Sequence, residues 1–244
     1  MENPSMLISL EGLQVKLFAD SAHPTAIRQL AGNPYIKGFT TNPTLMRKAG
    51  ITDYESFSRE MLAIVTDRPL SLEVFADDFA EMERQARKIA TWGNSVYVKI
   101  PVTNTRAEPS LDLIRRLSHS GLKLNVTALL SLKQVCDVSA ALAGGAPSFI
   151  SVFAGRVADT GVDPVPLMAA AVEIVKIYPQ IELIWASPRE LWNIFQANAI
   201  GCHVITATPD ILKKLELVGR NLLDYSLETV KMFYEDAVKS GFHI

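Results

Sequence analysis

The sequence predicts an α/β fold: a single (β/α)8 TIM barrel domain over residues 1–244, with an extra C-terminal helix. Eight short β-rich runs alternate with helical patterns, an order that is typical of a parallel sheet. The runs start about 27 residues apart, which is roughly the length of one strand, one crossover helix and two short loops. No linker, low-complexity segment or change of composition divides the chain, so one domain is expected.

The eight runs are rich in β-forming residues and are bounded by turn residues or helix starts. They are Val15–Asp20, Ile36–Asn42, Leu70–Phe75, Val96–Val102, Lys123–Leu129, Phe149–Arg156, Glu182–Ser187 and His203–Thr208. A doubly wound open sheet is the alternative, but it would usually have fewer strands or a nucleotide-binding loop. Neither G-x-G-x-x-G nor G-x-x-x-x-G-K-[ST] occurs in the chain.

Three helical patterns follow a residue that commonly caps a helix N-terminus. The caps and helices are Asp53 with 54–65, Ser131 with 132–143, and Asp163 with 164–178, the last with proline at its first position. Asp210 is expected to help start a helix over 211–217. A last amphipathic stretch, 226–239, ends at Gly241 and follows no strand of its own.

The composition excludes several classes of protein. With 48% hydrophobic residues, 20% charged residues and a net charge of −2, the chain is neither disordered nor a basic binder of nucleic acid. No apolar run is long enough for a membrane span, and the N-terminus lacks the pattern of a secretory signal. Cys136 and Cys202 are too few for a disulfide framework. We therefore expect a cytoplasmic protein.

Alternation within the strands indicates where the function lies. In the fourth run, Val96, Val98 and Ile100 share one parity and Tyr97 and Lys99 the other, and only one parity can face the barrel interior. The inward set is Asp20, Asn42, Glu73, Lys99, Asn125, Thr127, Ser151 and Ser187. These lie near the C-terminal ends of strands, where such barrels build active sites. A purely structural barrel would place Val, Ile and Leu there.

Lys99 is the candidate nucleophile. Burial disfavours the charged form of an amine, and a neutral amine can attack a carbonyl to form a Schiff base. Asp20 and Glu73 supply two carboxylates for the proton transfers that this chemistry needs. The alternatives are that Lys99 reaches solvent or binds a carboxylate, and that either carboxylate pairs with Lys99 or an arginine.

Polar side chains around these three fit a phosphorylated polyol. Asn42 and Asn125 can hydrogen-bond hydroxyl groups, or they can cap turns and strand ends. Arg156 and Arg189 follow the sixth and seventh runs in the expected loops, where two arginines suit a phosphate, although each alone could be a surface ion pair. The four histidines and two cysteines show no ligand spacing, so neither a metal nor a cofactor is expected.

Two motifs resemble those of the transaldolase family. Gly38–Met46 (GFTTNPTLM) resembles the family signature G-x-T-[ST]-N-P-[ST], and Val96–Thr103 (VYVKIPVT) is similar to its Schiff-base lysine segment. The likeness extends over nearly the whole chain. It implies that Lys99 forms the Schiff base and that Asp20 is the acid/base at the substrate C4 hydroxyl. It also implies that Glu73 and Thr127 hold the water that shuttles protons.

The resemblance also implies how substrate is bound. The dihydroxyacetone fragment would be held by Asn42, Asn125 and Ser151, and the phosphate by Arg156, Ser187 and Arg189. The phosphate residues belong to two segments, Ser151–Arg156 (SVFAGR) and Ala186–Arg189 (ASPR), that are similar to S-P-F-V-G-R and A-S-F-R of the family.

Two substrate-site positions separate branches of this family. Small fructose-6-phosphate aldolases usually have Gln in place of Glu73 and Tyr in place of Phe153, so both residues here follow the transaldolase branch. Two departures, the segment 103–109 after the lysine motif and Pro188 in place of an aromatic residue, bear on the identity of the sugar.

The expected function is transfer of dihydroxyacetone from a ketose phosphate, sedoheptulose 7-phosphate or fructose 6-phosphate, to an aldose phosphate. The alternatives are an aldolase that releases free dihydroxyacetone, a related enzyme acting on another anionic ketose, and a barrel that binds sugar phosphates without catalysis. The expected partners are sugar phosphates and further copies of the chain, with no nucleic acid and no membrane.

Overall fold

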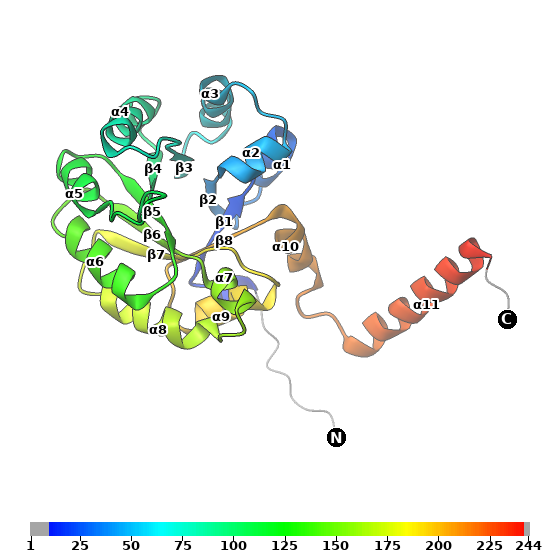
Figure 1. Cartoon of the computed structure of the whole chain (residues 1–244). Helices are drawn as coiled ribbons and strands as arrows, with labels where there is room; N and C mark the ends of the chain where they lie inside the picture. The colour runs from blue at the N-terminus through cyan, green and yellow to red at the C-terminus, as the bar shows by residue number, and fades with distance from the viewer. Residues whose placement is uncertain (1–9, 242–244) are drawn as a thin grey trace. The chain divides into compact units, whose positions relative to one another are not determined.

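The computed structural model describes residues 10–241 and confirms the predicted barrel. Eight parallel strands close into a ring in chain order, with the helices outside them (Figure 1). The strands are β1 (Lys16–Asp20), β2 (Ile36–Thr40), β3 (Leu70–Glu73), β4 (Val96–Pro101), β5 (Leu124–Leu129), β6 (Ser148–Val152), β7 (Ile181–Trp185) and β8 (Val204–Ala207). The ring closes where β1 pairs with β8.

Helices alternate with the strands along the chain. They are α1 (Pro24–Ala31), α2 (Pro43–Lys48), α3 (Tyr54–Ile64), α4 (Phe79–Ala90), α5 (Leu111–His119), α6 (Leu132–Leu142), α7 (Ala154–Asp159), α8 (Pro164–Val175), α9 (Trp192–Ala199), α10 (Pro209–Lys213) and α11 (Leu222–Ser240). Two short 3-10 helices, η1 (Leu10–Gly12) and η2 (Lys214–Leu217), complete the described elements. Asp53, Ser131 and Asp163 accept backbone N–H bonds as the expected N-caps.

The chain divides into two compact units. One runs from Leu13 to Leu212 and contains all eight strands, and the other contains the remaining described residues, 10–12 and 213–241. Taken by itself, α11 is an amphipathic helix with Asn221 as its N-cap and Gly241 in the left-handed conformation at its C-cap. That residues 1–244 form a single domain stays a prediction.

Several predicted boundaries differ from the observed ones, and three of them lie at helix starts. The sixth run was extended to Arg156, but β6 ends at Val152 and Arg156 lies on α7. The helix after β8 starts at Pro209, because proline suits a first helical position, so Asp210 lies inside the first turn instead of before it. The last helix starts at Leu222, four residues before the predicted 226, because the side chain of Asn221 caps it there.

Apolar side chains fill the middle of the barrel. Phe18, Phe149, Ile184, Ala186 and Val204 form a buried cluster, against which Tyr97 and Phe153 pack. Gly38 is required beside it, since a Cβ at this position would lie 2.5 Å from Cζ of Phe18.

Two kinds of feature are absent from residues 10–241. No helix in this part of the chain is long and apolar enough to cross a membrane. The same residues hold no group of three or more His, Cys, Asp or Glu side chains that could bind a metal ion.

Candidate active site

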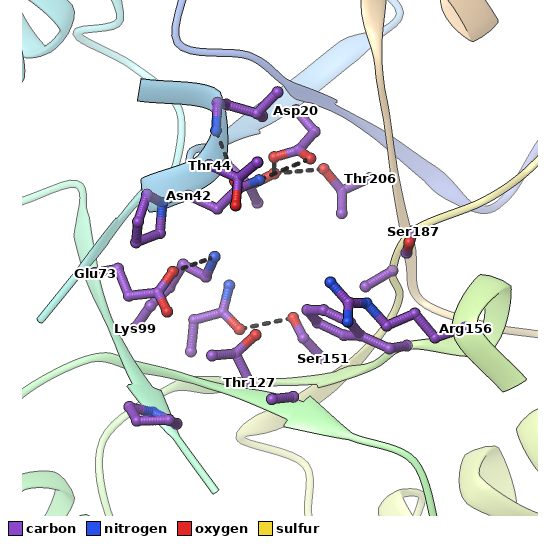
Figure 2. A pocket seen from close by; sticks show the side chains of 18 of the residues that line it. Asp20, Asn42, Thr44, Glu73, Lys99, Thr127, Ser151, Arg156, Ser187 and Thr206 are labelled. Atoms are coloured by element: carbon purple, nitrogen blue, oxygen red, sulfur yellow. Dashed lines mark hydrogen bonds and ion pairs between the residues drawn. The ribbon is translucent and has the colours of Figure 1, made fainter. Parts of the chain in front are cut away.

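A cavity of about 480 Å³ opens at the C-terminal ends of the strands. Figure 2 shows polar side chains converging on it from around the ring. All of the site residues that the sequence predicted line this cavity, namely Asp20, Asn42, Glu73, Lys99, Asn125, Thr127, Ser151, Phe153, Arg156, Ser187 and Arg189. Their chemical roles stay predictions.

Lys99 lies at the buried base of the cavity, with 6% of its surface exposed. Its Nζ is 2.9 Å from Oε2 of Glu73 on the neighbouring strand and donates a hydrogen bond of 2.8 Å to the carbonyl oxygen of Thr41. The Tyr54 hydroxyl donates to the backbone carbonyl of Glu73 at 3.0 Å, and burial raises the pKa of Tyr54. The amine is therefore paired with a carboxylate, and the Tyr54 hydroxyl holds the backbone of the residue that bears this carboxylate.

Asp20 ends β1 and faces the same cavity. Its Oδ1 accepts a hydrogen bond of 2.8 Å from the Thr40 hydroxyl, and its Oδ2 accepts one of 3.3 Å from the side-chain amide of Asn42. Burial raises the pKa of the Asp20 carboxyl, against the opposing effects of the Lys99 charge and of these two donors. A carboxyl in this setting is suited to accept and return a proton during turnover.

Asn42 serves two purposes at once. Besides donating to Asp20, its side-chain oxygen accepts the backbone N–H of Leu45 at 3.0 Å and caps α2. Capping, one of the two alternatives that the sequence left open, is therefore observed, whereas hydrogen bonding to a substrate hydroxyl stays a prediction. The cap fixes the amide orientation, so the N–H groups point toward Asp20.

A second amide is fixed between two serines. The Asn125 side chain is completely buried, donates to Oγ of Ser71 at 3.0 Å and accepts from Oγ of Ser151 at 2.7 Å. Its neighbour Thr127 is 3% exposed, and its hydroxyl has no hydrogen-bond partner among the described residues. A buried hydroxyl that lines a cavity without a partner is a candidate contact for a ligand or a water.

Two residues of the cavity wall have positive backbone φ angles, which change the direction of their side chains. Ala128 has φ of 66° where the pairing of β5 with β6 shifts register. Ser187 has φ of 61° and lies beyond the end of β7. Because Ile184 and Ala186 pack in the barrel interior, a regular strand would turn Ser187 outward. The prediction that Ser187 faces inward on a strand is therefore wrong, since Ser187 reaches the cavity from a loop.

The two arginines at the cavity mouth differ in their surroundings. Arg156, on α7, lies over the Phe153 ring at 5.5 Å from its centroid. Its guanidinium forms no hydrogen bond or salt bridge with any residue between 10 and 241. An anionic ligand could therefore take all of its donors.

Arg189 is occupied by protein groups. Its Nε donates to Asp159 at 2.7 Å, its Nη2 pairs with the same carboxylate, and its Nη1 donates to Ser187 at the carbonyl (2.8 Å) and at Oγ (2.9 Å). The guanidinium holds the pKa of Asp159 below its usual value. Gly155 allows this arrangement, because a Cβ there would overlap the Ser187 carbonyl.

Sequence reasoning missed three residues of this site. Thr40 and Thr206 are buried hydroxyls 2.6 Å apart beside Asp20, and Asp159 anchors Arg189. Thr206 shares the strand parity of the interior residue Val204, which was an available signal. Nothing in the sequence pattern joins Asp159 to Arg189.

Fold and site together define a (β/α)8 barrel with a buried lysine–carboxylate pair at the C-terminal face of its strands. The family model described as transaldolase/fructose-6-phosphate aldolase matches residues 17–244. The chain belongs to this family.

Similar proteins agree with that membership. A "Probable transaldolase" of Dehalococcoides mccartyi is 37% identical over 202 residues, or 82% of this chain and 90% of the relative. A second "Probable transaldolase", from Chelativorans sp., is 37% identical over 231 residues, which is 93% of this chain and 98% of that protein. Thiamine phosphate pyrophosphorylase from Pyrococcus furiosus matches 84% of this chain and 96% of its own, with a TM-score of 0.56 and 12% identity, a likeness of fold alone.

Proposed function

We propose that the protein is a transaldolase that moves a dihydroxyacetone unit from a ketose phosphate to an aldose phosphate through a Schiff base on Lys99. The observation that carries the proposal is the placement of the Lys99 amine. It is buried at the base of a cavity that also contains two carboxylates, Glu73 and Asp20. A module that only binds sugars has no need of an amine in that position.

Imine formation uses the Lys99–Glu73 pair. After losing a proton, the amine adds to the C2 carbonyl of the ketose, and the resulting carbinolamine loses water to give a protonated imine. Glu73 is 2.9 Å from the amine and can accept the proton that must leave it. Thr127, with its unpartnered hydroxyl on the same wall, is suited to hold the water that leaves and later returns.

Carbon–carbon cleavage uses Asp20. Its carboxylate takes the proton of the C4 hydroxyl while the C3–C4 bond breaks, the aldehyde leaves, and the electron pair of that bond enters the imine to form an enamine. The enamine carbon then attacks the carbonyl of an acceptor aldose, and the proton returns from Asp20 to the new alkoxide. Hydrolysis of the imine releases the product and restores Lys99.

Substrate orientation follows from the remaining side chains. Asn42 and the Asn125–Ser151 pair are suited to the hydroxyl groups of the three-carbon fragment. Arg156 and the Ser187 hydroxyl are suited to the phosphate at the mouth. Arg189 supports phosphate binding in two ways. Its Nη1 orients the Ser187 side chain, and its remaining guanidinium N–H can donate to the phosphate.

Borohydride trapping followed by peptide mapping tests this proposal. With fructose 6-phosphate, the reduced adduct should form on the peptide that contains Lys99, and it should be absent from a Lys99→Met variant. Adding erythrose 4-phosphate should yield a seven-carbon ketose phosphate, whereas an aldolase would release dihydroxyacetone with or without that acceptor. Absence of any adduct would contradict the Schiff base and favour a binding protein.

We also propose that the enzyme assembles as a homo-oligomer in the cytoplasm. Taken by itself, α11 buries none of its side chains, although it contains Leu223, Leu227, Val230 and Phe233. Both cysteines are free thiols, as expected in a reducing compartment. Light scattering at several concentrations would measure the assembly, and a monomeric mass throughout would contradict it.

A further inference from the structure

We propose that Thr206 is a positioning residue for the reaction: through Thr40, it fixes the Asp20 carboxyl in the orientation that accepts the substrate proton. This inference rests on the proposed function, because it takes Asp20 as the acid/base. Thr206 lies outside the quoted family motifs, and Thr40, although it lies in the Gly38–Met46 motif, received no role from the resemblance.

The three side chains form a hydrogen-bonded chain across the ring closure. Thr206 Oγ1 on β8 is 2.6 Å from Thr40 Oγ1 on β2, and Thr40 Oγ1 is 2.8 Å from Asp20 Oδ1 on β1. The strand that bears Asp20 pairs with the strands that bear both threonines. Two neighbouring strands therefore hold the carboxyl on the strand between them.

The direction of the chain follows from the number of protons. A threonine hydroxyl has one proton, and Thr40 donates its proton to the Asp20 carboxylate. The bond between the two threonines must then be donated by Thr206. Thr40 is 3% exposed and Thr206 is 6% exposed, so water has little access to replace either donor. A donor at the far end polarises the next hydroxyl and strengthens its bond to the carboxylate.

Asp20 is held at both oxygens. Oδ1 accepts from Thr40 and Oδ2 accepts from Asn42, so the carboxylate cannot rotate without breaking a hydrogen bond. The charged groups that act on it are Lys99 on β4, which lowers its pKa, and Glu73 on β3, which raises it; burial also raises it. The hydrogen bond from Thr40 lowers the pKa of Asp20, so weakening that bond should raise it.

The test compares Thr206→Val, which removes the hydroxyl at nearly constant volume, with Thr206→Ser, which keeps it. We expect Thr206→Val to lower kcat by about tenfold or more and to move the acid limb of the kcat/KM profile to higher pH, because the misplaced carboxyl accepts the C4 proton poorly. Thr206→Ser should restore most of both. Thr91→Val is the matched control, since this hydroxyl donates to a helix carbonyl outside the cavity.

A double-variant cycle tests the route through Thr40. If Thr206 acts only through Thr40, Thr206→Val should have no further effect on kcat in a Thr40→Val background. Additive losses would overturn the relay. An unchanged pH profile in Thr206→Val, or failure of serine to restore the activity, would overturn the positioning role in favour of packing alone.

The trapped adduct separates this inference from the proposed function. A defect at Asp20 slows cleavage after the imine has formed, so borohydride should trap more six-carbon and less three-carbon adduct on Thr206→Val than on wild type. Equal total adduct would also show that the variant is folded. If wild type forms no adduct, both proposals fail, whereas a normal adduct ratio in Thr206→Val contradicts the relay alone.

Discussion

Replacing Lys99 with methionine should destabilise the protein as well as inactivate it. An unpaired buried amine would make this substitution stabilising, because it would remove an isolated charge. The structure reverses that expectation, since Lys99 Nζ lies 2.9 Å from the Glu73 carboxylate, and the two side chains are only 7% and 16% exposed. Methionine would leave the carboxylate buried without its partner and the Thr41 carbonyl without its donor.

The magnitude follows from the burial of the pair. Removing one member of a buried ion pair costs about 3–5 kcal/mol, and the water contact that Glu73 keeps places this case near the lower value. A loss of about 3 kcal/mol lowers the melting temperature of a chain of this size by roughly 6–12 °C. Methionine matches the length of the lysine stem closely, so a packing loss adds little.

Urea titration and calorimetry at neutral pH measure this loss. The Lys99→Met, Glu73→Gln double variant removes both charges and should recover to within about 1 kcal/mol of wild type, while remaining unable to form the imine. If the two substitutions prove additive, or if Lys99→Met is as stable as wild type, the ion pair does not stabilise the cavity and the reasoning is wrong.

Three further predictions concern groups around this pair. Asp20→Asn should be more stable than wild type at pH 7, because burial raises the folded pKa of Asp20 above its unfolded value and the ionised form then destabilises the fold. The gain in unfolding free energy is about 1.4 kcal/mol for each pKa unit. Urea titrations at several pH values should show that the gain vanishes below about pH 4. Arg156→Ala should lower kcat/KM for phosphorylated ketoses by an amount equivalent to about 2–4 kcal/mol of transition-state stabilisation, and should lower kcat/KM for unphosphorylated fructose much less. A smaller loss than in Arg189→Ala would contradict the assignment of Arg156 as the main phosphate ligand. Phe153→Tyr adds a proton donor at the cavity wall and should raise the ratio of free dihydroxyacetone to transfer product, measured in one coupled assay with and without acceptor.

Most of the fold could be predicted because each strand and helix repeats one local pattern. Alternation of period two, spacing near one βα unit, and recognisable caps placed every strand within a few residues of its observed position. The largest error came at Phe149–Arg156. Phe153 continues the strand pattern, and Ala154-Gly155 is a poor helix start by composition, so nothing local marks the change at Val152.

The site could be predicted where a charge or an amide stood out on an apolar strand. Burying the charges of Lys99 and Glu73 costs free energy, so their presence on apolar strands indicated a functional site. Thr40 and Thr206 were missed because threonine is an ordinary strand residue, and its hydroxyl becomes informative only when barrel closure brings two strands beside Asp20. Ser187 was placed on a strand because a positive φ at a serine has no clear sequence signal.

Barrel closure between β1 and β8 also affects folding of the chain during its synthesis. Thr40 and Thr206 are 166 residues apart in the chain, an interval that a ribosome needs roughly 8–33 s to synthesise. Until β8 emerges, β1 has one unpaired edge, and such edges are templates for association with other chains. The Asp20 carboxyl, the proposed acid/base, thus receives its last support only after the whole ring has been translated, so a nascent or truncated chain that lacks β8 should be both inactive and prone to aggregate.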